Sequence, residues 1–391
     1  MNKRILITGM GAVSAIGNDV AENYDSLRKG KSGICRVQYL DTEHTEFPVG
    51  EVKLSNEELC QALNIPYTNM ESRTDLLGML AVREALLSAA LIDAKHLALI
   101  SGTTVGGMDR TEKFYPDNLN AVILGNHDCG SGTDRIADYF GNFDFATTIS
   151  TACSSALNAI IVGAEMIEAG LKDIVVVGGT ESLSRFHLNG FKSLMILDHN
   201  ICRPFNADRA GLNLGEGAGF LVIESEESVK RRGANVLAEL KGTGNACDAY
   251  HQTASSENGE GAFLAMSKAV AEGGIHVDDI QYVNAHGTGT PNNDACESSA
   301  LSRVFGNKMP KVSSTKMYTG HTTSASGSIE AVYSILSLLH QFVPANLGWT
   351  KADDRCITPF TNGDCGNLSN VMCNSFGFGG NDSSIILSRY E

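Results

Sequence analysis

The chain repeats one pattern of strands and helices twice along its length. A β-rich run followed by glycines opens it in "RILITGMGAVSAIG", and a similar run, "VLAELKGTGNACDAY", follows the basic stretch "KRRGA". Each run precedes further alternation of buried strands and helical patterns, which is typical of α/β folds. The repeat predicts two α/β halves of like topology, residues 1–235 and 236–391. No Pro- or Ser-rich spacer separates them, so we expect the halves to pack together.

One β-α-β unit of the first half carries a cysteine at a critical place. Residues 145–150 are predicted to be a strand, residues 153–169 show helical spacing of apolar side chains, and residues 174–177 form the next strand. Cys153 would then stand at a helix N-terminus, where unpaired N–H groups and the helix dipole favour thiolate over thiol. Its small neighbours would admit a bulky thioester. Position alone leaves a structural role open, because the chain has ten cysteines.

The opening glycines at positions 9, 11 and 17 invite comparison with a dinucleotide-binding loop. The third glycine of the G-x-G-x-x-G pattern would fall at position 14, which is Ser14. A structural glycine turn is therefore the prediction for this segment. No cofactor and no metal ion are expected.

The composition excludes several classes of function. A formal net charge of −15 argues against general binding to nucleic acid or to anionic membranes. No apolar run approaches the roughly 18 residues of a membrane helix, and the first seven residues lack the apolar core of a signal peptide. The ten cysteines are scattered without a C-x-x-C pair, which indicates reduced thiols, mostly buried. We expect a cytoplasmic protein.

Two histidines occupy matching loops of the second half. His286 lies in "NAHGTGTPNND" at the end of an apparent strand, and His321 lies in "SSTKMYTGHTTSASGSIEAV", just before a helix that begins near Ser324. Parallel α/β sheets place reactive groups in loops after their strands. Either histidine alone could be an ordinary hydrogen-bonded residue. Together with Cys153 they form a set suited to acyl transfer.

Two further features accompany these histidines. Lys316 and Glu330 flank His321, and a lysine buried near an imidazole needs such a partner. An ordinary surface salt bridge is the alternative interpretation. In "NSFGFGGND", residues 374–382, Phe376 and Phe378 lie among glycines. A backbone N–H there could complete an oxyanion hole, and an aromatic ring could swing as a gate.

Several motifs, taken together and in order, make the chain resemble a known family. They are "TACSSALNAI", "CRPFNADRAGLNLGEGAGFLVIE", "DAYHQT", "NAHGTGTPNNDACE", "SSTKMYTGHTTSASGSIEA" and "NSFGFGGND". From Ile5 to Leu387 the chain is similar to the β-ketoacyl-acyl-carrier-protein synthases of the decarboxylating Cys-His-His type, closest to the branch of synthases I and II. The resemblance implies a thiolase-like fold, with the duplicated halves in a five-layer αβαβα sandwich, and an obligate homodimer. It also implies an acyltransferase that joins an acyl primer to malonyl by Claisen condensation, with acyl carrier protein as partner.

The resemblance implies a role for each matching residue. Cys153 would accept the acyl group, while His286 and His321 would polarise the malonyl thioester carbonyl and stabilise the enolate left by loss of CO₂. The N–H groups of Cys153 and Phe378 would form the oxyanion hole, and the ring of Phe378 would be the gate. Decarboxylation generates the carbanion, so hydrogen-bond donors are needed here and a strong base is not.

Other matches would support the site or bind substrate. Lys316 would order the site with Glu330 as its partner. The remaining supporting positions are Asp294, Glu297, Thr288, Thr290, Phe376 and Gly377, while Asp248, Tyr250, His251 and Thr253 match a mobile entrance loop and Met108 a substrate position. Carrier proteins are acidic, so a local basic dock is required, and Arg203 and Arg209 follow the entrance region of the family.

Three departures from the family leave the substrate open. Residues 110–144 look shortened and diverged, "LDHNICRPF" is contracted, and the entrance loop has Gln252 and Ser255 where the family more often has Met and Pro. Chain length and primer type are therefore not predicted. Similarly trimmed sequences occur among synthases for aryl polyenes and other polyketides.

Two other functions compete with a condensing enzyme. One is a catalytically silent partner subunit of a ketosynthase heterodimer, but such subunits lack the cysteine that is present here as Cys153. The other is a non-decarboxylating thiolase, which would require a second cysteine near the site. Cys373 lies close to the "GFGG" segment, yet His321 occupies the position of the family's second histidine.

Overall fold

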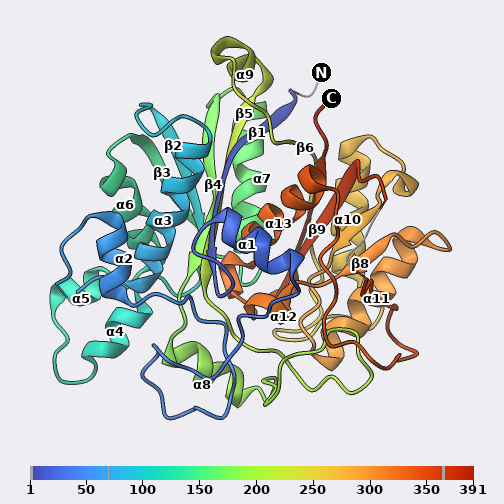
Figure 1. Cartoon of the computed structure of the whole chain (residues 1–391), viewed down its shortest axis with the longest axis horizontal. Helices are drawn as coiled ribbons and strands as arrows, with labels where there is room; N and C mark the ends of the chain where they lie inside the picture. The colour runs from blue at the N-terminus through green and yellow to red at the C-terminus, as the bar shows by residue number, and fades with distance from the viewer. Residues whose placement is uncertain (1–2, 69, 363–365) are drawn as a thin grey trace.

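The computed structural model describes residues 3–68, 70–362 and 366–391 (Figure 1). Its strands form one sheet in the order β3-β2-β4-β5-β1-β6-β10-β9-β7-β8. Counted from the outer edge to the centre, the first half has the order β3-β2-β4-β5-β1 and the second has β8-β7-β9-β10-β6. Each strand of the second half thus takes the place of the strand five positions earlier in the first, which confirms two halves of like topology. The strands are β1 (Ile5–Ser14), β2 (Leu97–Gly102), β3 (Phe143–Ile149), β4 (Ile174–Glu181), β5 (Gly217–Ser225), β6 (Ala238–Cys247), β7 (Tyr282–Asn284), β8 (Lys311–Ser313), β9 (Asn370–Gly377) and β10 (Asn381–Ser388).

Helices cover both faces of each half-sheet. They are α1 (Val20–Arg28), α2 (Asn56–Leu63), α3 (Arg73–Ser88), α4 (Met108–Phe114), α5 (Ala121–Gly125), α6 (Cys129–Phe140), α7 (Ser155–Glu168), α8 (Arg185–Ser193), α9 (Glu226–Arg232), α10 (Glu260–Gly273), α11 (Pro291–Phe305), α12 (Lys316–Thr319) and α13 (Ser326–His340), with 3₁₀ turns η1 (Val277–Asp279), η2 (Thr323–Ala325) and η3 (Phe378–Gly380). In Figure 1, α7 and α13 lie between the halves, α3 covers the outside of the first, and α10 and α11 cover the second. These are the five layers of the αβαβα sandwich.

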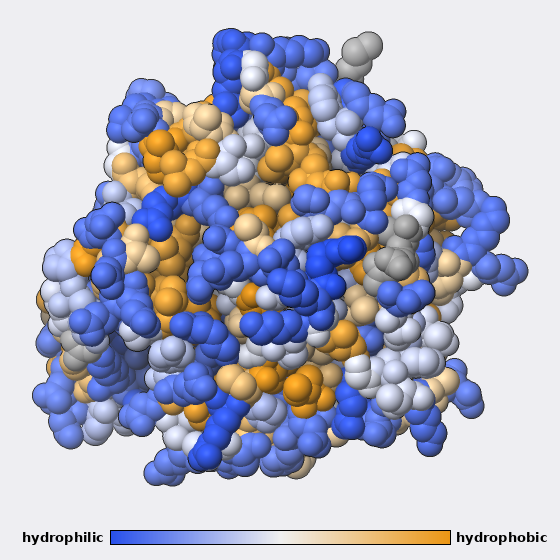
Figure 2. All heavy atoms as spheres, viewed as in Figure 1, coloured by the Kyte–Doolittle hydropathy of each residue, from blue (hydrophilic) through white to orange (hydrophobic). Residues whose placement is uncertain are grey.

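The central layer explains why the strands are so apolar. The central strands β1 and β6 pair only through Ile5–Ile7, so the two half-sheets are joined along a short stretch and enclose α7 and α13. One large apolar cluster contains side chains of both helices and of both half-sheets. Strands covered on both faces need near-continuous apolar runs, as in residues 175–177 of β4, which are fully buried. Figure 2 shows hydrophobic residues over the region of β5 and α7, between the halves, and mostly hydrophilic residues over α9 and α10.

The glycines at the start of the chain have a different role from the predicted turn. Gly9 and Gly11 lie inside β1, where an added Cβ would come 2.3 Å from the carbonyl oxygen of Ala85 and 2.1 Å from that of Ala81. Their hydrogens let α3 pack directly on the strand. The prediction of a glycine turn is wrong for these two, and the turn is at Ser14–Gly17 instead.

Other expectations can be compared directly with the fold. The strand, helix and strand around Cys153 are β3, α7 and β4, with β2 pairing in parallel with both strands, so the β-α-β unit is confirmed. All nine described cysteines are free and five are buried, while Cys365, like Met1 at the start of the chain, lies outside the described residues. Within the described ranges, no helix is both long and apolar enough to cross a membrane.

Candidate active site

Cys153 lies in a tight loop, residues 150–154, between β3 and α7. The helix begins at Ser155 with Ser154 as its N-cap. Cys153 therefore lies just before the helix, whereas the sequence pattern predicted that the helix would begin at Cys153 itself. Ala152 has a φ of +52°, a left-handed conformation that is uncommon for a residue with a side chain. The loop is held by bonds from the Ser155 hydroxyl to the Ala152 carbonyl (2.6 Å) and from the Ser375 hydroxyl to the Cys153 carbonyl (2.8 Å).

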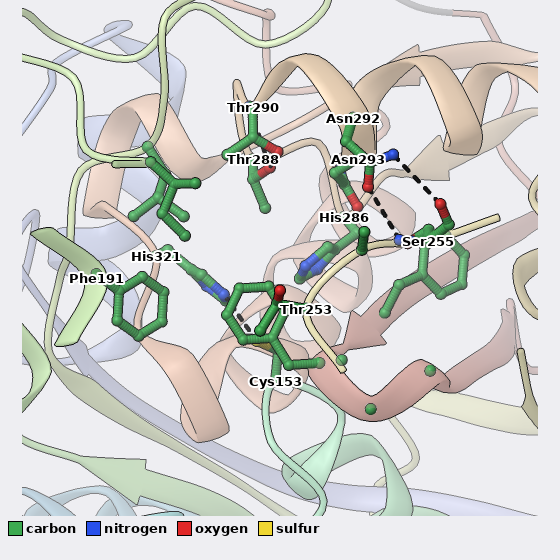
Figure 3. Close-up of a pocket in the computed structure, with 18 of the residues that line it drawn as sticks. Cys153, Phe191, Thr253, Ser255, His286, Thr288, Thr290, Asn292, Asn293 and His321 are labelled. Atoms are coloured by element: carbon green, nitrogen blue, oxygen red, sulfur yellow. Dashed lines mark hydrogen bonds between the residues drawn. The ribbon is translucent and has the colours of Figure 1, made fainter. Parts of the chain in front are cut away.

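The fold brings both predicted histidines to this cysteine (Figure 3). The Sγ of Cys153 lies 3.0 Å from Nε2 of His321. The ring of His286 meets that of His321 nearly at a right angle, with 5.2 Å between the ring centroids. All three side chains are buried and line one cavity, so they can act on the same substrate atoms.

The protonation state of the cysteine differs from the expected one. Burial raises the pKa of the Cys153 thiol to about 11, although the charge of Lys316 and the backbone N–H groups of Phe378 and Cys153 oppose this shift. Desolvation of the thiolate therefore outweighs the favourable end of the helix. At neutral pH the sulfur is a thiol, and Nε2 of His321 is the nearby base that can accept its proton.

Acidic side chains fix the loop that carries His286. Both carboxylate oxygens of Glu297 accept backbone N–H bonds, from His286 at 2.8 Å and from Gly287 at 2.7 Å. Asp294 accepts from the N–H groups of Gly289 (3.1 Å) and Phe205 (2.7 Å).

Burial lowers the pKa of His286 and of His321 well below the usual range, and the charge of Lys316 lowers it further. Both imidazoles are therefore neutral at physiological pH.

Lys316 and Glu330 form a buried ion pair and not a surface salt bridge. The lysine Nζ lies 2.7 Å from Oε1 of Glu330, and the two residues are 1% and 3% exposed. Lys316 begins α12, while Glu330 lies on α13, so the pair joins two elements beside His321. A fixed positive charge thus stands next to the reactive groups.

Lys316→Met should destabilise the protein by about 3–5 kcal/mol, because it leaves the Glu330 carboxylate buried without its partner. The double change Lys316→Met with Glu330→Leu should recover most of that loss. Urea unfolding of the single and double variants measures the difference. Lys29→Met, which breaks an exposed pair with Asp25, is the control and should change stability by less than about 1 kcal/mol. Equal losses in the single and double variants would contradict this account.

The glycine-rich turn after β9 faces the nucleophile. The backbone N–H of Phe378 lowers the pKa of the Cys153 thiol, so this group lies near the sulfur. The ring of Phe378 stacks on Phe191 of α8, with 5.8 Å between the ring centroids. Gly379 has a φ of +83°, and its N–H donates to the carbonyl of Gln252 at 2.8 Å. The turn is therefore attached to the entrance loop.

The cavity has a volume of ≈ 250 Å³. Nine of the predicted site residues line it: Cys153, Thr253, His286, Thr288, Thr290, His321, Phe376, Gly377 and Phe378. The prediction missed Phe191, Ile196, Leu212, Ala254, Ser255, Pro291, Asn292, Asn293, Gly379 and Gly380. The two asparagines stand directly after the "HGTGTP" motif and could have been found there. Phe191 and Ile196 belong to a segment without a polar motif, so only the fold reveals their place.

Some predicted residues lie away from the cavity wall. The carboxylate of Asp248 accepts bonds from the N–H and hydroxyl of Ser256 (2.7 and 2.6 Å) and so closes the base of the entrance loop. Tyr250 and His251 are exposed on that loop. Met108 begins α4 and does not line the cavity.

The structure does not support Arg209 as a docking residue. Its side chain is 1% exposed, lies 2.7 Å from Asp353 and 3.6 Å from Asp294, and donates to the carbonyl of Pro291. No part of its guanidinium is available to a carrier protein, and the prediction is wrong for this residue. Arg203 is partly exposed but bonds to Asp198 and Asp208.

Asn381, at the start of β10, holds the nucleophile loop in place. Its side-chain oxygen accepts bonds from the Ser154 hydroxyl (3.1 Å) and from the amides of Asn158 (2.8 Å) and Asn245 (3.0 Å). Ser154 is the N-cap of the helix behind Cys153, and Asn158 is the fourth residue of that helix. Because Asn381 directly follows the turn with Phe378, it sets the position of the cysteine relative to that N–H.

Asn381→Ala should lower kcat about 10- to 100-fold with little change in KM, because misplacement of the sulfur affects reaction more than binding. Steady-state kinetics with a carrier-bound substrate measures both. Asn381→Asp keeps the accepting oxygen and should recover most of the rate. Asn18→Ala, at an exposed asparagine outside this network, is the control. An unchanged kcat in Asn381→Ala would rule out the positioning role.

Comparisons with known proteins extend over the whole chain. Residues 2–228 match the model "Beta-ketoacyl synthase, N-terminal domain", and residues 237–350 match "Beta-ketoacyl synthase, C-terminal domain". The 3-oxoacyl-[acyl-carrier-protein] synthase 2 of Staphylococcus aureus (strain COL) is 35% identical, with 100% of this chain and 99% of that protein covered.

Solved structures are similar over the same length. The ishigamide ketosynthase/chain length factor superposes with a TM-score of 0.91 at 30% identity, with both chains covered completely. A type II polyketide acyl carrier protein in complex with its ketosynthase (AntDE:AntF) gives a TM-score of 0.88 at 25% identity, again over both complete chains.

Proposed function

Because the chain belongs to the β-ketoacyl synthase family, we propose that it condenses an acyl primer, held as a thioester on Cys153, with malonyl carried on acyl carrier protein. The products are the β-ketoacyl carrier protein and CO₂. The 3.0 Å contact between Cys153 and His321, with the neutral ring of His286 facing the same cavity, is the observation that carries the proposal. It provides a nucleophile, a base for its proton and two hydrogen-bond donors at one place.

The first half-reaction loads the enzyme. The thiol of Cys153 attacks the thioester carbonyl of the acyl carrier protein while its proton moves to Nε2 of His321. The N–H groups of Cys153 and Phe378 stabilise the oxyanion. The carbon–sulfur bond to the carrier then breaks, and the departing thiolate takes the proton back from His321. The acyl group is left on Cys153.

The second half-reaction forms the new carbon–carbon bond. The bond between the malonyl carbon and its carboxylate breaks, CO₂ leaves, and the electron pair enters an enolate. The Nε2–H groups of His286 and His321 stabilise the enolate oxygen. The carbanion carbon attacks the acyl carbonyl on Cys153, the carbon–sulfur bond breaks, and the departing thiolate takes up one proton from solvent by way of His321. Among the described residues, Nδ1 of each histidine has no hydrogen-bond partner, so His321 can present Nε2 as acceptor first and as donor later.

The cavity has an apolar and a polar wall. Phe191, Ile196 and Leu212 provide apolar side chains, whereas threonine hydroxyls and asparagine amides line the side of the "HGTGTPNN" segment. A hydroxyl- and amide-bearing wall suits the amide-containing arm that links a thioester to its carrier. We place the arm on this wall, with the thioester at Cys153.

Purified protein incubated with acyl- and malonyl-loaded carrier protein should yield a β-ketoacyl carrier protein and CO₂, detected by mass spectrometry. A silent partner subunit would give neither product. A non-decarboxylating thiolase is not favoured, because Cys373 is fully buried and does not line the cavity. Absence of product with every carrier of a panel of acyl chain lengths would reject the proposal.

We also propose that the enzyme acts as a dimer in the cytoplasm, where cysteines stay reduced. Strand β3 is at the edge of the sheet and pairs only with β2, and Phe145 on it is 41% exposed. An exposed edge with apolar side chains favours pairing with another chain. The partner is a second copy or a related subunit, and native mass spectrometry distinguishes them. The halves 1–235 and 236–391 are proposed as the two structural units of each subunit.

A further inference from the structure

The reactive side chains also form a set of metal ligands. Sγ of Cys153 and one ring nitrogen each of His286 and His321 lie within 4.8 Å of one another, and all three residues are buried. Across residues 3–68, 70–362 and 366–391, no other group of three or more His, Cys, Asp or Glu side chains has this spacing. Thiolate and imidazole together are preferred ligands of Zn²⁺.

The separations are close to those of a tetrahedral zinc site. With bonds of about 2.3 Å to sulfur and about 2.05 Å to nitrogen, ligand atoms stand about 3.6 Å (S to N) and about 3.4 Å (N to N) apart. When a zinc ion binds, Sγ of Cys153 and Nε2 of His321, which are 3.0 Å apart, have to separate by about half an ångström. The distances from the His286 ring nitrogen to the other two ligand atoms are at most 4.8 Å and have to shorten by at most about 1.5 Å.

The cavity leaves a side of the cluster open. The three side chains point into the same ≈ 250 Å³ space, which is also bordered by Thr253 and Thr288 (Figure 3). Three protein ligands with a water molecule in the fourth position are a common arrangement of zinc. Access is therefore available to an ion that enters by the substrate route.

The surroundings are those of a weak, reversible site and not of a resident metal. Ligating histidines normally donate their other ring N–H to an acceptor, which strengthens metal binding about 10- to 100-fold. Neither Nδ1, of His286 or of His321, has such a partner in the described part of the chain. Lys316 adds a positive charge nearby, balanced by Glu330 at 2.7 Å.

We propose that Zn²⁺ binds Cys153, His286 and His321, with water as fourth ligand, and reversibly switches the enzyme off. This inference rests on the proposed function for its inhibitory effect. Binding exchanges the thiol proton for the metal, with the proton released to solvent and no change of oxidation state. The bound ion occupies the nucleophilic sulfur and the two imidazole nitrogens that would donate to the enolate, so neither half-reaction can proceed. An acyl group on Cys153 removes one ligand, so the acylated enzyme should resist the metal.

Co²⁺ titration of the full-length protein tests the site without turnover. Tetrahedral Co²⁺ bound to a thiolate has strong visible bands and a sulfur-to-metal band in the near ultraviolet. We expect both in the wild type and complete loss of the ultraviolet band in Cys153→Ala. His286→Ala should weaken Co²⁺ binding at least about 10-fold. Zn²⁺ should bleach the bands and inhibit condensation over the same concentration range.

Cys247→Ser, which changes an exposed thiol, is the control and should leave the spectrum unchanged. Bands that persist in Cys153→Ala, or that vanish in Cys247→Ser, would place the metal elsewhere and overturn the inference. If Cys153→Ala does not fold, wild-type enzyme preloaded with an acyl group provides the second test and should lack the ultraviolet band. Intact Co²⁺ bands in a protein without acyl transfer would reject the proposed function alone.

Discussion

Cys153→Ala should abolish transfer of a labelled acyl group from carrier protein to the enzyme. The sulfur is the group at which both candidate oxyanion donors and the His321 ring converge. Alanine leaves the cavity, the histidines and the buried ion pair in place, so only the covalent step is lost. Mass spectrometry of the protein after incubation with acyl carrier protein measures the adduct directly, and the expected amount in the variant is zero.

The same variant should still release CO₂ from malonyl carrier protein, because that step uses the imidazoles and not the sulfur. Retained CO₂ release therefore shows that the variant is folded and binds the carrier arm. Cys247→Ala, at an exposed thiol, should keep the adduct. A covalent acyl group that survives Cys153→Ala would mean that another residue is the nucleophile and would remove the basis of the proposed function.

The sequence located the reactive residues because each lies in a local motif of small or turn-forming residues. Such motifs report what the backbone must do at one place, as in the loops of Cys153, His286 and Phe378. The duplication was also predictable, because the pattern of the first half recurs in the second, whereas the order of the strands in the sheet was not predicted. A local pattern does not show which segments from elsewhere in the chain pack around a side chain, and so it does not predict that side chain's burial or its partners.

Three differences show this limit. The thiol of Cys153 was expected to ionise from its place near a helix start, yet burial by segments distant in the sequence raises its pKa. Arg209 was expected at the surface, yet Asp353 and Asp294, both from the second half, enclose its guanidinium. Phe191 was not predicted at all, because its stacking on Phe378 joins α8 to the end of β9. Each case depends on contacts between the halves.

His286→Ala or His321→Ala should reduce CO₂ release from malonyl carrier protein by about 10² or more, as expected when one preorganised donor to a developing oxyanion is lost. The two variants should differ in the first half-reaction. His321 contacts the thiol at 3.0 Å, so its loss should also slow acyl transfer. His286→Ala should leave acyl transfer close to normal. His276→Ala, at an exposed histidine, is the control for both assays.

The pH dependence of CO₂ release tests the same donors. Burial and the charge of Lys316 lower the pKa of both histidines well below the usual value. A lowered pKa keeps the neutral ring as pH falls, so the rate should stay level through pH 6.5, where an exposed histidine gains its proton. A step in the rate near that pH would show that an imidazole of ordinary pKa controls the reaction. Near-normal CO₂ release in either alanine variant would refute the role of that histidine, whatever the pH profile.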